Sequence, residues 1–107
     1  MCGITGFWAR HSEPQAWLQD LGGAVRSLQQ RGPDDNGTWV REGGEVAFGH
    51  TRLSILDLSP SGHQPMLSHD GDAVMVFNGE VYNYAEIRRE LEREGHSFRS
   101  SSRRISA

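Results

Sequence analysis

The chain has 107 residues, of which 36% are hydrophobic and 23% charged, a composition that suits one small folded domain with a modest core. The net charge of -3 and the lack of a basic stripe argue against nucleic-acid binding. A single cysteine excludes an internal disulfide and fits a reducing compartment. No apolar run approaches the roughly 20 residues of a membrane span, and no signal peptide is evident, so we expect a cytoplasmic protein without membrane contact.

The first part of the chain predicts a strand followed by a helix. Residues 3–9 are apolar and partly β-branched, which favours a strand. Apolar residues then recur at helical spacing over residues 15–30, and Ser12 is a candidate cap for this helix. Gly22 and Gly23 weaken the helix by roughly 1 kcal/mol each relative to alanine, and they suggest close packing on that side.

The rest of the chain predicts short strands separated by turns, and then a second helix. The strands are expected at residues 38–40, 45–48, 49–58, 73–77 and 80–82. The apolar segment 73–77 has no polar alternation, so we expect it to be buried on both faces. Residues 84–94 form the clearest helical pattern, with Gly95 as its stop. The spacing of Arg89 from Glu86 and Glu92 allows ion pairs on a charged face that we interpret as solvated.

The only cysteine is the second residue. Removal of Met1 would leave Cys2 with a thiol and a free α-amine on one residue. The thiol pKa is about 8.5 and the amine pKa about 8, so the neutral amine can accept the thiol proton. One residue can then supply both nucleophile and base. A lone cysteine is nevertheless more often a small buried hydrophobe, so position alone is weak evidence for catalysis.

Five motifs occur in a fixed order along the chain: MCGITGF at 1–7, RGPDDNG at 31–37, GHTRLSILDLS at 49–59, GHQPM at 62–66 and FNGEVYN at 77–83. Together they resemble the glutaminase domain of class II glutamine amidotransferases, in the asparagine synthetase branch. The resemblance extends over nearly the whole chain. It identifies residues 1–107 as a partial glutaminase domain and includes none of the family's synthetase domain.

The resemblance implies an α+β fold of the N-terminal nucleophile hydrolase type, an αββα sandwich of antiparallel sheets that is incomplete here at its C-terminus. It implies hydrolysis of L-glutamine, with ammonia passing to a synthetase domain that amidates an acceptor carboxylate. This chain is expected to need no cofactor, since ATP and Mg²⁺ are implied only for the absent synthetase domain. A homodimer is compatible with the full-length family.

The resemblance also assigns roles to individual residues. Cys2 would form a thioester with the glutamine side chain, and Asn78 and Gly79 would donate hydrogen bonds to the oxyanion. Arg52 would hold the substrate α-carboxylate through its planar fork, although an arginine taken by itself suggests a surface ion pair. Glu80 is a candidate for the substrate α-ammonium. The implied glutamine-binding residues are Arg52, Leu53, Ser54, Ile55, Leu56, Asn78, Gly79 and Glu80.

Other polar residues point to no metal site. The adjacent carboxylates of Asp34 and Asp35 have spacing for a metal but are more often part of a turn. The histidines have no short metal-ligand spacing, and we interpret them all as structural or solvated. They are His11, His50, His63, His69 and His96.

The sequence departs from the family pattern after Ser102. An aspartate that binds the substrate α-ammonium is expected there, but the chain has Arg103 and Arg104, which would repel an ammonium group. We therefore expect a truncated or frameshifted chain with exposed strand edges and apolar faces, low stability and little glutaminase activity. Ordinary glutamine turnover together with a cooperative thermal transition would contradict this.

Two alternatives remain beside the leading interpretation of an incomplete glutamine-hydrolysing module. One is a non-catalytic remnant or interaction module of the same fold, which retention of Met1 would favour. The other is a small redox or metal-binding protein that uses Cys2, which predicts disulfide-linked dimers or bound metal.

Overall fold

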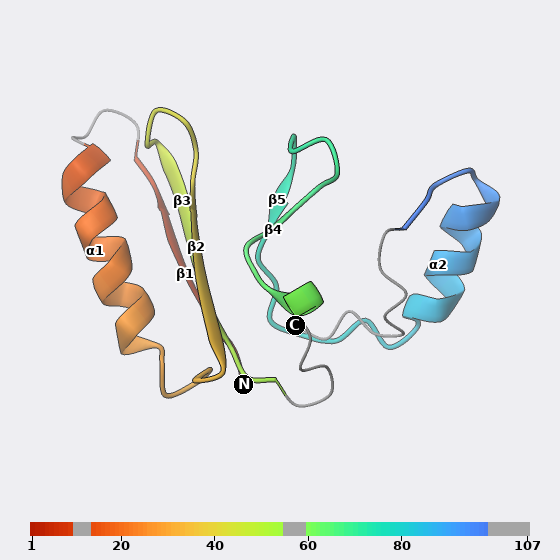
Figure 1. Cartoon of the computed structure of the whole chain (residues 1–107), viewed down its shortest axis with the longest axis horizontal. Coiled ribbons are helices and arrows are strands. Elements are labelled where there is room, and N and C mark those ends of the chain that lie inside the picture. The colour runs from red at the N-terminus through yellow and green to blue at the C-terminus, as the bar shows by residue number, and fades with distance from the viewer. Residues whose placement is uncertain (10–13, 55–59, 99–107) are drawn as a thin grey trace.

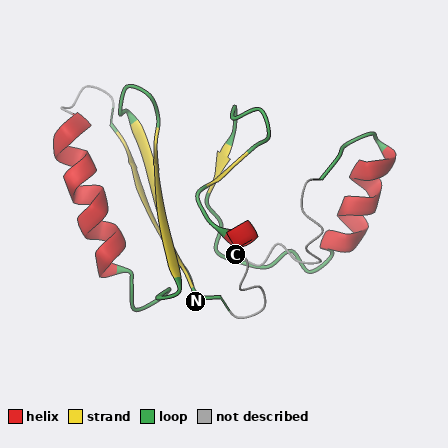
Figure 2. Ribbon diagram, in the orientation of Figure 1, coloured by secondary structure: helices red, strands yellow, loops and turns green. Residues whose placement is uncertain are grey.

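The computed structural model describes residues 1–9, 14–54 and 60–98. Within them the chain forms two antiparallel sheets and two α-helices, a small α+β arrangement (Figures 1 and 2). The elements in chain order are β1 (Gly3–Trp8), α1 (Pro14–Ser27), β2 (Asp35–Val40), β3 (Val46–Arg52), a 3-10 turn (Pro60–Gly62), β4 (Met66–Leu67), β5 (Val74–Met75) and α2 (Tyr84–Arg93).

The larger sheet has the strand order β1-β3-β2, with every neighbouring pair antiparallel. β3 is therefore central, and its register sets Gly3 opposite Thr51 and Asp35 opposite Arg52. Because successive side chains of a strand point to opposite faces, His50 and Arg52 share the face that lies away from α1. This face carries the candidate site at the end of the sheet where β1 begins.

Helix α1 lies along the other face of the sheet (Figure 1). Its buried residues Leu21 and Val25 face Gly49 of β3, where an added Cβ would meet both side chains. Near the start of the helix, the rings of Trp17 and Phe7 are 5.6 Å apart. The predicted amphipathic helix is confirmed, but the close packing comes from glycine in the sheet.

Two glycine substitutions test this packing, and we expect them to change the free energy of unfolding in opposite directions. An added Cβ at Gly22 would meet only the flexible end of Arg26, 3.5 Å away, so Gly22→Ala should stabilise the chain by about 0.5–1 kcal/mol. Gly49→Ala would drive a methyl group into Val25 and Thr5, and should destabilise by about 1–3 kcal/mol. Chemical denaturation of both variants measures the difference, and equal effects would contradict the packing described here.

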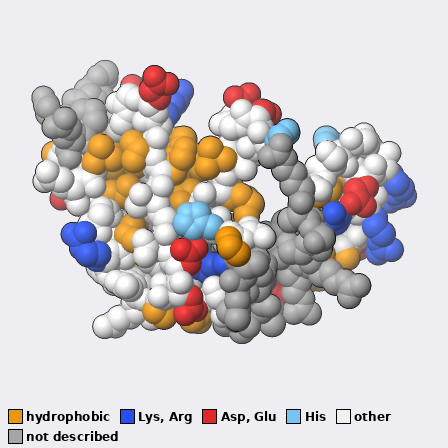
Figure 3. Space-filling model, in the orientation of Figure 1, with side chains coloured by type: hydrophobic (Ala, Val, Ile, Leu, Met, Phe, Trp, Pro, Cys, Tyr) orange, Lys and Arg blue, Asp and Glu red, His pale blue; other side chains and the backbone are white. Residues whose placement is uncertain are grey.

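The sheet face away from α1 is apolar and partly open. Trp39 and Phe48 stack on it with ring centroids 5.9 Å apart, while Trp8 is 73% exposed. A groove of about 600 Å³ runs along it, lined by residues of β1 and β3 together with Val76. Figure 3 shows hydrophobic side chains gathered over this part of the sheet. The exposed apolar surface expected from the sequence is thus present.

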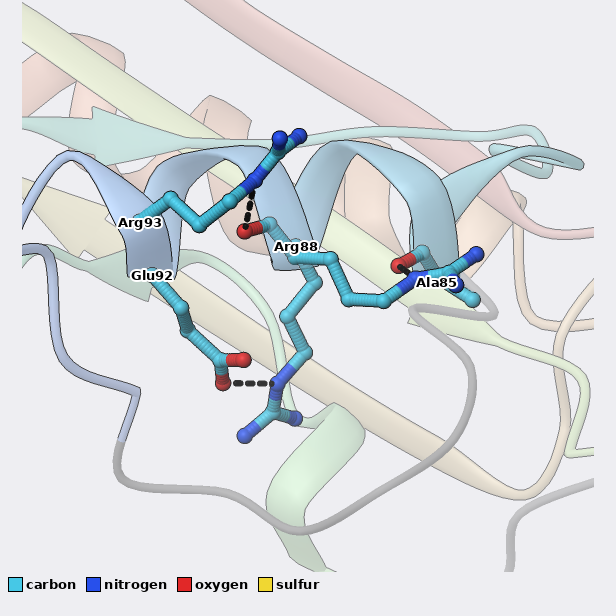
Figure 4. Close-up of polar contacts among 5 residues, drawn as sticks. Ala85, Arg88, Glu92 and Arg93 are labelled. Atoms are coloured by element: carbon cyan, nitrogen blue, oxygen red, sulfur yellow. Dashed lines mark hydrogen bonds and ion pairs between the residues drawn. The ribbon is translucent and has the colours of Figure 1, made fainter.

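Helix α2 stands apart from the larger sheet and contains no buried residue (Figure 1). The predicted element is confirmed, and Gly95 follows it with a positive φ of 96°. The ion pair on this helix joins Arg88 to Glu92 at 2.8 Å (Figure 4), whereas Arg89, whose spacing also allows ion pairs, donates to the carbonyl of Ala85 at 3.1 Å. Neither described helix has the length and apolar character needed to cross a membrane.

Three strand predictions are wrong. Residues 49–52 continue β3 instead of opening a new strand, and residues 55–58 of that prediction lie outside the described residues, as does Ser12. The segment 73–77 forms only the two-residue strand β5, whose Met75 is 44% exposed. Residues 80–82 form no strand beyond a single bridge at Glu80.

Candidate functional site

The site is centred on Cys2, at the end of the larger sheet where β1 begins. The side chain is 3% exposed, and the backbone N–H of Leu53 donates to its Sγ at 3.4 Å. The strand register explains this contact, because pairing of Gly3 with Thr51 brings the residue before β1 beside the residues that end β3.

The carbonyl of Cys2 receives two side-chain donors. Nδ2 of Asn78 donates at 3.0 Å across 76 residues of sequence, and Nε of Arg31 donates at 3.4 Å. An amide Nδ2 carries two hydrogens, so the Asn78 amide retains a second donor beyond the one used here. The structure therefore brings Asn78 beside Cys2, as the sequence led us to expect.

Gly79, the residue after Asn78, is a glycine because of close packing and not because of a positive φ. Positive φ occurs at Gly43, Gly44, Gly71 and Gly95 among the described residues, and Gly79 is not one of them. Instead, a Cβ at Gly79 would be 2.8 Å from the ring of Phe77. Glycine is needed here because the aromatic ring folds over the backbone.

Arg52 ends β3 and is 4% exposed. Its guanidinium lies against Gly62, where an added Cβ would be only 2.6 Å from Cζ. The interpretation as a surface arginine is therefore wrong, because this guanidinium is buried at the same end of the sheet as Cys2. Its carbonyl accepts the N–H of Asp34 at 3.0 Å, which joins the loop before β2 to the end of β3.

The remaining predicted binding residues are only partly placed at the site. Leu53 contacts Cys2 through its backbone, whereas the N–H of Ser54 is used by the Asp34 carboxylate at 2.7 Å. Glu80 is exposed. The predicted residues Ile55 and Leu56 lie outside the described residues. So do Arg103 and Arg104, which stand where the family pattern has an aspartate.

The adjacent carboxylates Asp34 and Asp35 each fasten one loop. Asp34 binds the Ser54 N–H, and Oδ2 of Asp35 lies 2.7 Å from Nδ1 of His63. Asp35 also accepts the N–H of Asn36 at 2.9 Å. Both side chains are engaged within the chain, which favours the interpretation of these residues as a turn.

His50 is buried beneath the site on the same face as Arg52, with an exposure of 1%. Neither ring nitrogen has a hydrogen bond of good geometry among the described residues, although the Phe77 backbone lies near enough to act on the ring electrostatically. Burial lowers the pKa of His50 below its ordinary value of 6.5, and the nearby charges of Arg52 and His63 lower it further, against opposing effects of the Phe77 backbone and Asp35. Sequence reasoning treated His50 like the other histidines, although its place among apolar residues of a central strand was the available signal.

The buried imidazole predicts a specific pH dependence of stability. Because the pKa of His50 is lowered on folding, the unfolded chain binds more protons as the pH falls below 6.5, and the folded chain is destabilised over that window. We expect the free energy of unfolding to fall more between about pH 7.5 and about pH 5.5 in wild type than in His50→Gln, which cannot titrate there. Denaturant titrations at both pH values measure the difference, and parallel losses in the two proteins would contradict it.

Sequence reasoning missed two residues that shape the site. Arg31 donates to the Cys2 carbonyl, and Gln64, which is 3% exposed, binds the backbone of Phe77 through both ends of its amide. Both residues lie inside the motifs noted in the sequence, yet a motif does not say which backbone group a side chain will reach. Their roles come from contacts across distant parts of the chain.

Taken together, a small antiparallel α+β scaffold presents a buried cysteine whose sulfur and carbonyl receive donors from three other segments. Comparison with known proteins identifies the family. A model of the glutamine amidotransferase domain matches residues 1–104, so the chain belongs to this family. No solved structure matches the chain.

Three curated relatives illustrate the range of similar proteins. The chain is 40% identical over 106 residues to asparagine synthetase [glutamine-hydrolyzing] 1 of Bacillus subtilis, covering 95% of this chain and 16% of that protein. It is 39% identical over 100 residues to amidase chry2 of Gibberella zeae, covering 85% and 15%. It is 34% identical over 110 residues to putative asparagine synthetase [glutamine-hydrolyzing] 2 of Methanocaldococcus jannaschii, covering 88% and 21%. The chain therefore spans about a fifth or less of the length of these relatives.

Proposed function

We propose that this chain carries the nucleophile-bearing part of a glutamine-hydrolysing module of the N-terminal nucleophile type. Removal of Met1, which is 76% exposed, would free the α-amine of Cys2 with little loss of packing. The amine would then accept the thiol proton. The Leu53 N–H, which lies 3.4 Å from Sγ, would help to hold the sulfur in place.

The proposed reaction has two steps. Sγ of Cys2 forms a bond to the amide carbon of glutamine, and the C–N bond breaks as ammonia leaves with the proton taken from the thiol. Water then cleaves the thioester, which releases glutamate and returns the thiol. Asn78 and Gly79 would donate to the oxyanion in both steps, and loss of one such donor typically costs about 10²–10³ in rate.

Charged residues around the nucleophile would hold the α-carboxylate and α-ammonium groups of glutamine. The buried fork of Arg52 suits the α-carboxylate, because guanidinium and carboxylate form paired hydrogen bonds. Glu80, together with backbone groups of residues 53–56, would complete the glutamine contacts. The ammonia would pass to a synthetase domain, in keeping with relatives that are named glutamine-hydrolysing asparagine synthetases. ATP and Mg²⁺ would be needed only by that domain.

The observation that carries the proposal is the contact between Asn78 and Cys2. Residues 76 positions apart meet at 3.0 Å, which sets an amide donor beside the only thiol of the chain. A cysteine that served only as a small core residue would not need a polar donor at its sulfur, which here receives the Leu53 N–H. This arrangement favours a nucleophile over a packing role.

The test is covalent labelling of Cys2 by a diazo-ketone analogue of glutamine. Intact mass first establishes that Met1 has been removed, and peptide mapping then locates the adduct. We expect stoichiometric labelling at Cys2 that L-glutamine suppresses and D-glutamine does not. If the processed, folded chain is not labelled, or if both enantiomers protect equally, the proposal is wrong.

A non-catalytic interaction module is the second candidate. It is favoured by helix α2, which has no buried residue, and by the open apolar face of the larger sheet. This alternative predicts that Met1 is retained and that Cys2 reacts no faster with the glutamine analogue than with a simple alkylating reagent. The labelling experiment therefore separates the two candidates.

A further inference from the structure

In the loop that precedes β4, the side chain of Gln64 forms the pair of backbone hydrogen bonds that a neighbouring strand would otherwise form. Oε1 of Gln64 accepts the N–H of Phe77 at 2.6 Å, and Nε2 of Gln64 donates to the carbonyl of Phe77 at 3.1 Å. Both backbone groups of Phe77 are thus satisfied by one amide that is 3% exposed. A neutral side chain with both a donor and an acceptor is needed, and among the amides only glutamine has this reach.

Phe77 immediately precedes the residues proposed to bind the oxyanion. The amide of Asn78 lies 3.0 Å from the Cys2 carbonyl, and the Phe77 ring covers Gly79. Fixing the N–H and carbonyl of Phe77 therefore fixes the backbone from which both donors project. The contact acts on the donors without touching the substrate.

Gln64 is itself held against the larger sheet. A Cβ at Gly37 of β2 would collide with the Gln64 carbonyl and would come within 2.8 Å of Nε2 of His63. His63 in turn lies 2.7 Å from Asp35 at the start of β2. The loop is thus anchored to a regular element on one side and to Phe77 on the other.

We propose that Gln64 is a positioning residue of the glutamine site, which holds the Asn78–Gly79 segment at the distance from Cys2 that oxyanion stabilisation requires. This inference rests on the proposed function. Removing the amide takes away the Gln64 hydrogen bonds to both backbone groups of the half-buried Phe77, and the segment is then free to shift. A displacement of about 1 Å at such a site can cost about 10²-fold in rate.

The experiment compares Gln64→Met, which keeps size but loses both hydrogen bonds, with Ser68→Ala as the matched control. Ser68 also binds backbone of the β4–β5 unit, accepting the Ala73 N–H at 2.9 Å, but it lies away from Cys2. Hydrogen exchange at the Phe77 amide reports the contact directly. The maximal rate and half-saturating concentration of Cys2 labelling by the diazo-ketone report the site.

In Gln64→Met we expect exchange at Phe77 to accelerate about tenfold or more. The maximal labelling rate should fall about 10–100-fold, while the half-saturating concentration changes by less than about twofold, since Arg52 is untouched. Ser68→Ala should leave all three values unchanged. Faster exchange with an unchanged labelling rate, or equal losses of rate and affinity, would overturn the positioning role.

A further variant, Gln64→Glu, covers the case in which Gln64→Met does not fold. The carboxylate that this substitution introduces retains the acceptor, and its protonated form also regains a donor. The labelling rate relative to wild type should therefore recover as the pH falls from about 7 to about 5, and a constant ratio would refute the role. Using the ratio at each pH removes the pH effects that wild type and the variant share. The charged and titratable groups near the loop are Asp35, His50, Arg52 and His63, and they are present in both proteins.

The same data separate the two proposals. If wild type shows no glutamine-protected labelling, the proposed function fails and the catalytic role of Gln64 fails with it. If wild type is labelled selectively and Gln64→Met is labelled equally fast, only the inference about Gln64 fails.

Discussion

Replacement of Cys2 by serine should reduce analogue labelling, and the low glutamine hydrolysis expected of this partial domain, by at least about 10³-fold, because the nucleophile of the proposed reaction is removed. The hydroxyl of serine can still accept the Leu53 N–H, and the Cys2 carbonyl still accepts from Asn78 and Arg31. We therefore expect the free energy of unfolding to change by less than about 1 kcal/mol. The variant should therefore lose its reaction with glutamine and its analogue while it keeps its folding stability.

Ammonia release measured under single-turnover conditions provides the sensitive readout, with denaturant unfolding in parallel. The matched control is the double variant Cys2→Ser/Ser27→Cys, which restores one thiol at the exposed end of α1. It should alkylate readily with a simple reagent and yet show no glutamine-protected labelling. Turnover by Cys2→Ser close to that of wild type would show that another group performs the reaction.

The second large effect is expected for Arg52→Lys, which should weaken glutamine binding on the order of 10²-fold. The guanidinium of Arg52 is buried and lies against Gly62, so that its orientation is set by the loop before β4. An ammonium group keeps the charge but cannot form the paired hydrogen bonds of a fork with a carboxylate. The lost affinity should appear with little change in the maximal labelling rate.

The measurement is the L-glutamine concentration that halves the rate of Cys2 labelling. Arg41→Lys is the control, because Arg41 is an exposed arginine in the connection between β2 and β3, where its backbone N–H donates to Val46 and its carbonyl accepts from Gly44. It should leave protection unchanged. Equal protection in Arg52→Lys and wild type would exclude Arg52 from α-carboxylate binding.

Local sequence patterns correctly predicted the elements that depend mainly on residues close together in the sequence. β1 was expected at residues 3–9 and runs over Gly3–Trp8, and the second helix was expected at residues 84–94 and runs over Tyr84–Arg93. Apolar periodicity and the glycine stop are sufficient for such segments. The strands expected at residues 38–40 and 45–48 likewise overlap β2 and β3.

Predictions failed where burial or continuity depends on distant partners. The apolar segment 73–77 seemed a fully buried strand, yet β5 has two residues and pairs only with β4 among the described residues. Residues 49–52 seemed to begin a new strand, but β3 continues through them because it pairs with β1 and β2 along its whole length. Neither pairing is encoded in the local pattern.

The sequence alone determined the nucleophile candidate, the motif order and the two helices, because these depend on residue chemistry and short-range geometry. Only the tertiary structure decided that Arg52 is buried, that the buried His50 ring has no hydrogen bond of good geometry in the described part of the chain, and that Gln64 binds Phe77. Contacts between segments 51 and 76 residues apart bring Leu53 and Asn78 to Cys2, and strand register and packing place them there. The physical reason is that hydrogen bonds to buried backbone form wherever folding leaves a donor and an acceptor together, irrespective of their separation in the chain.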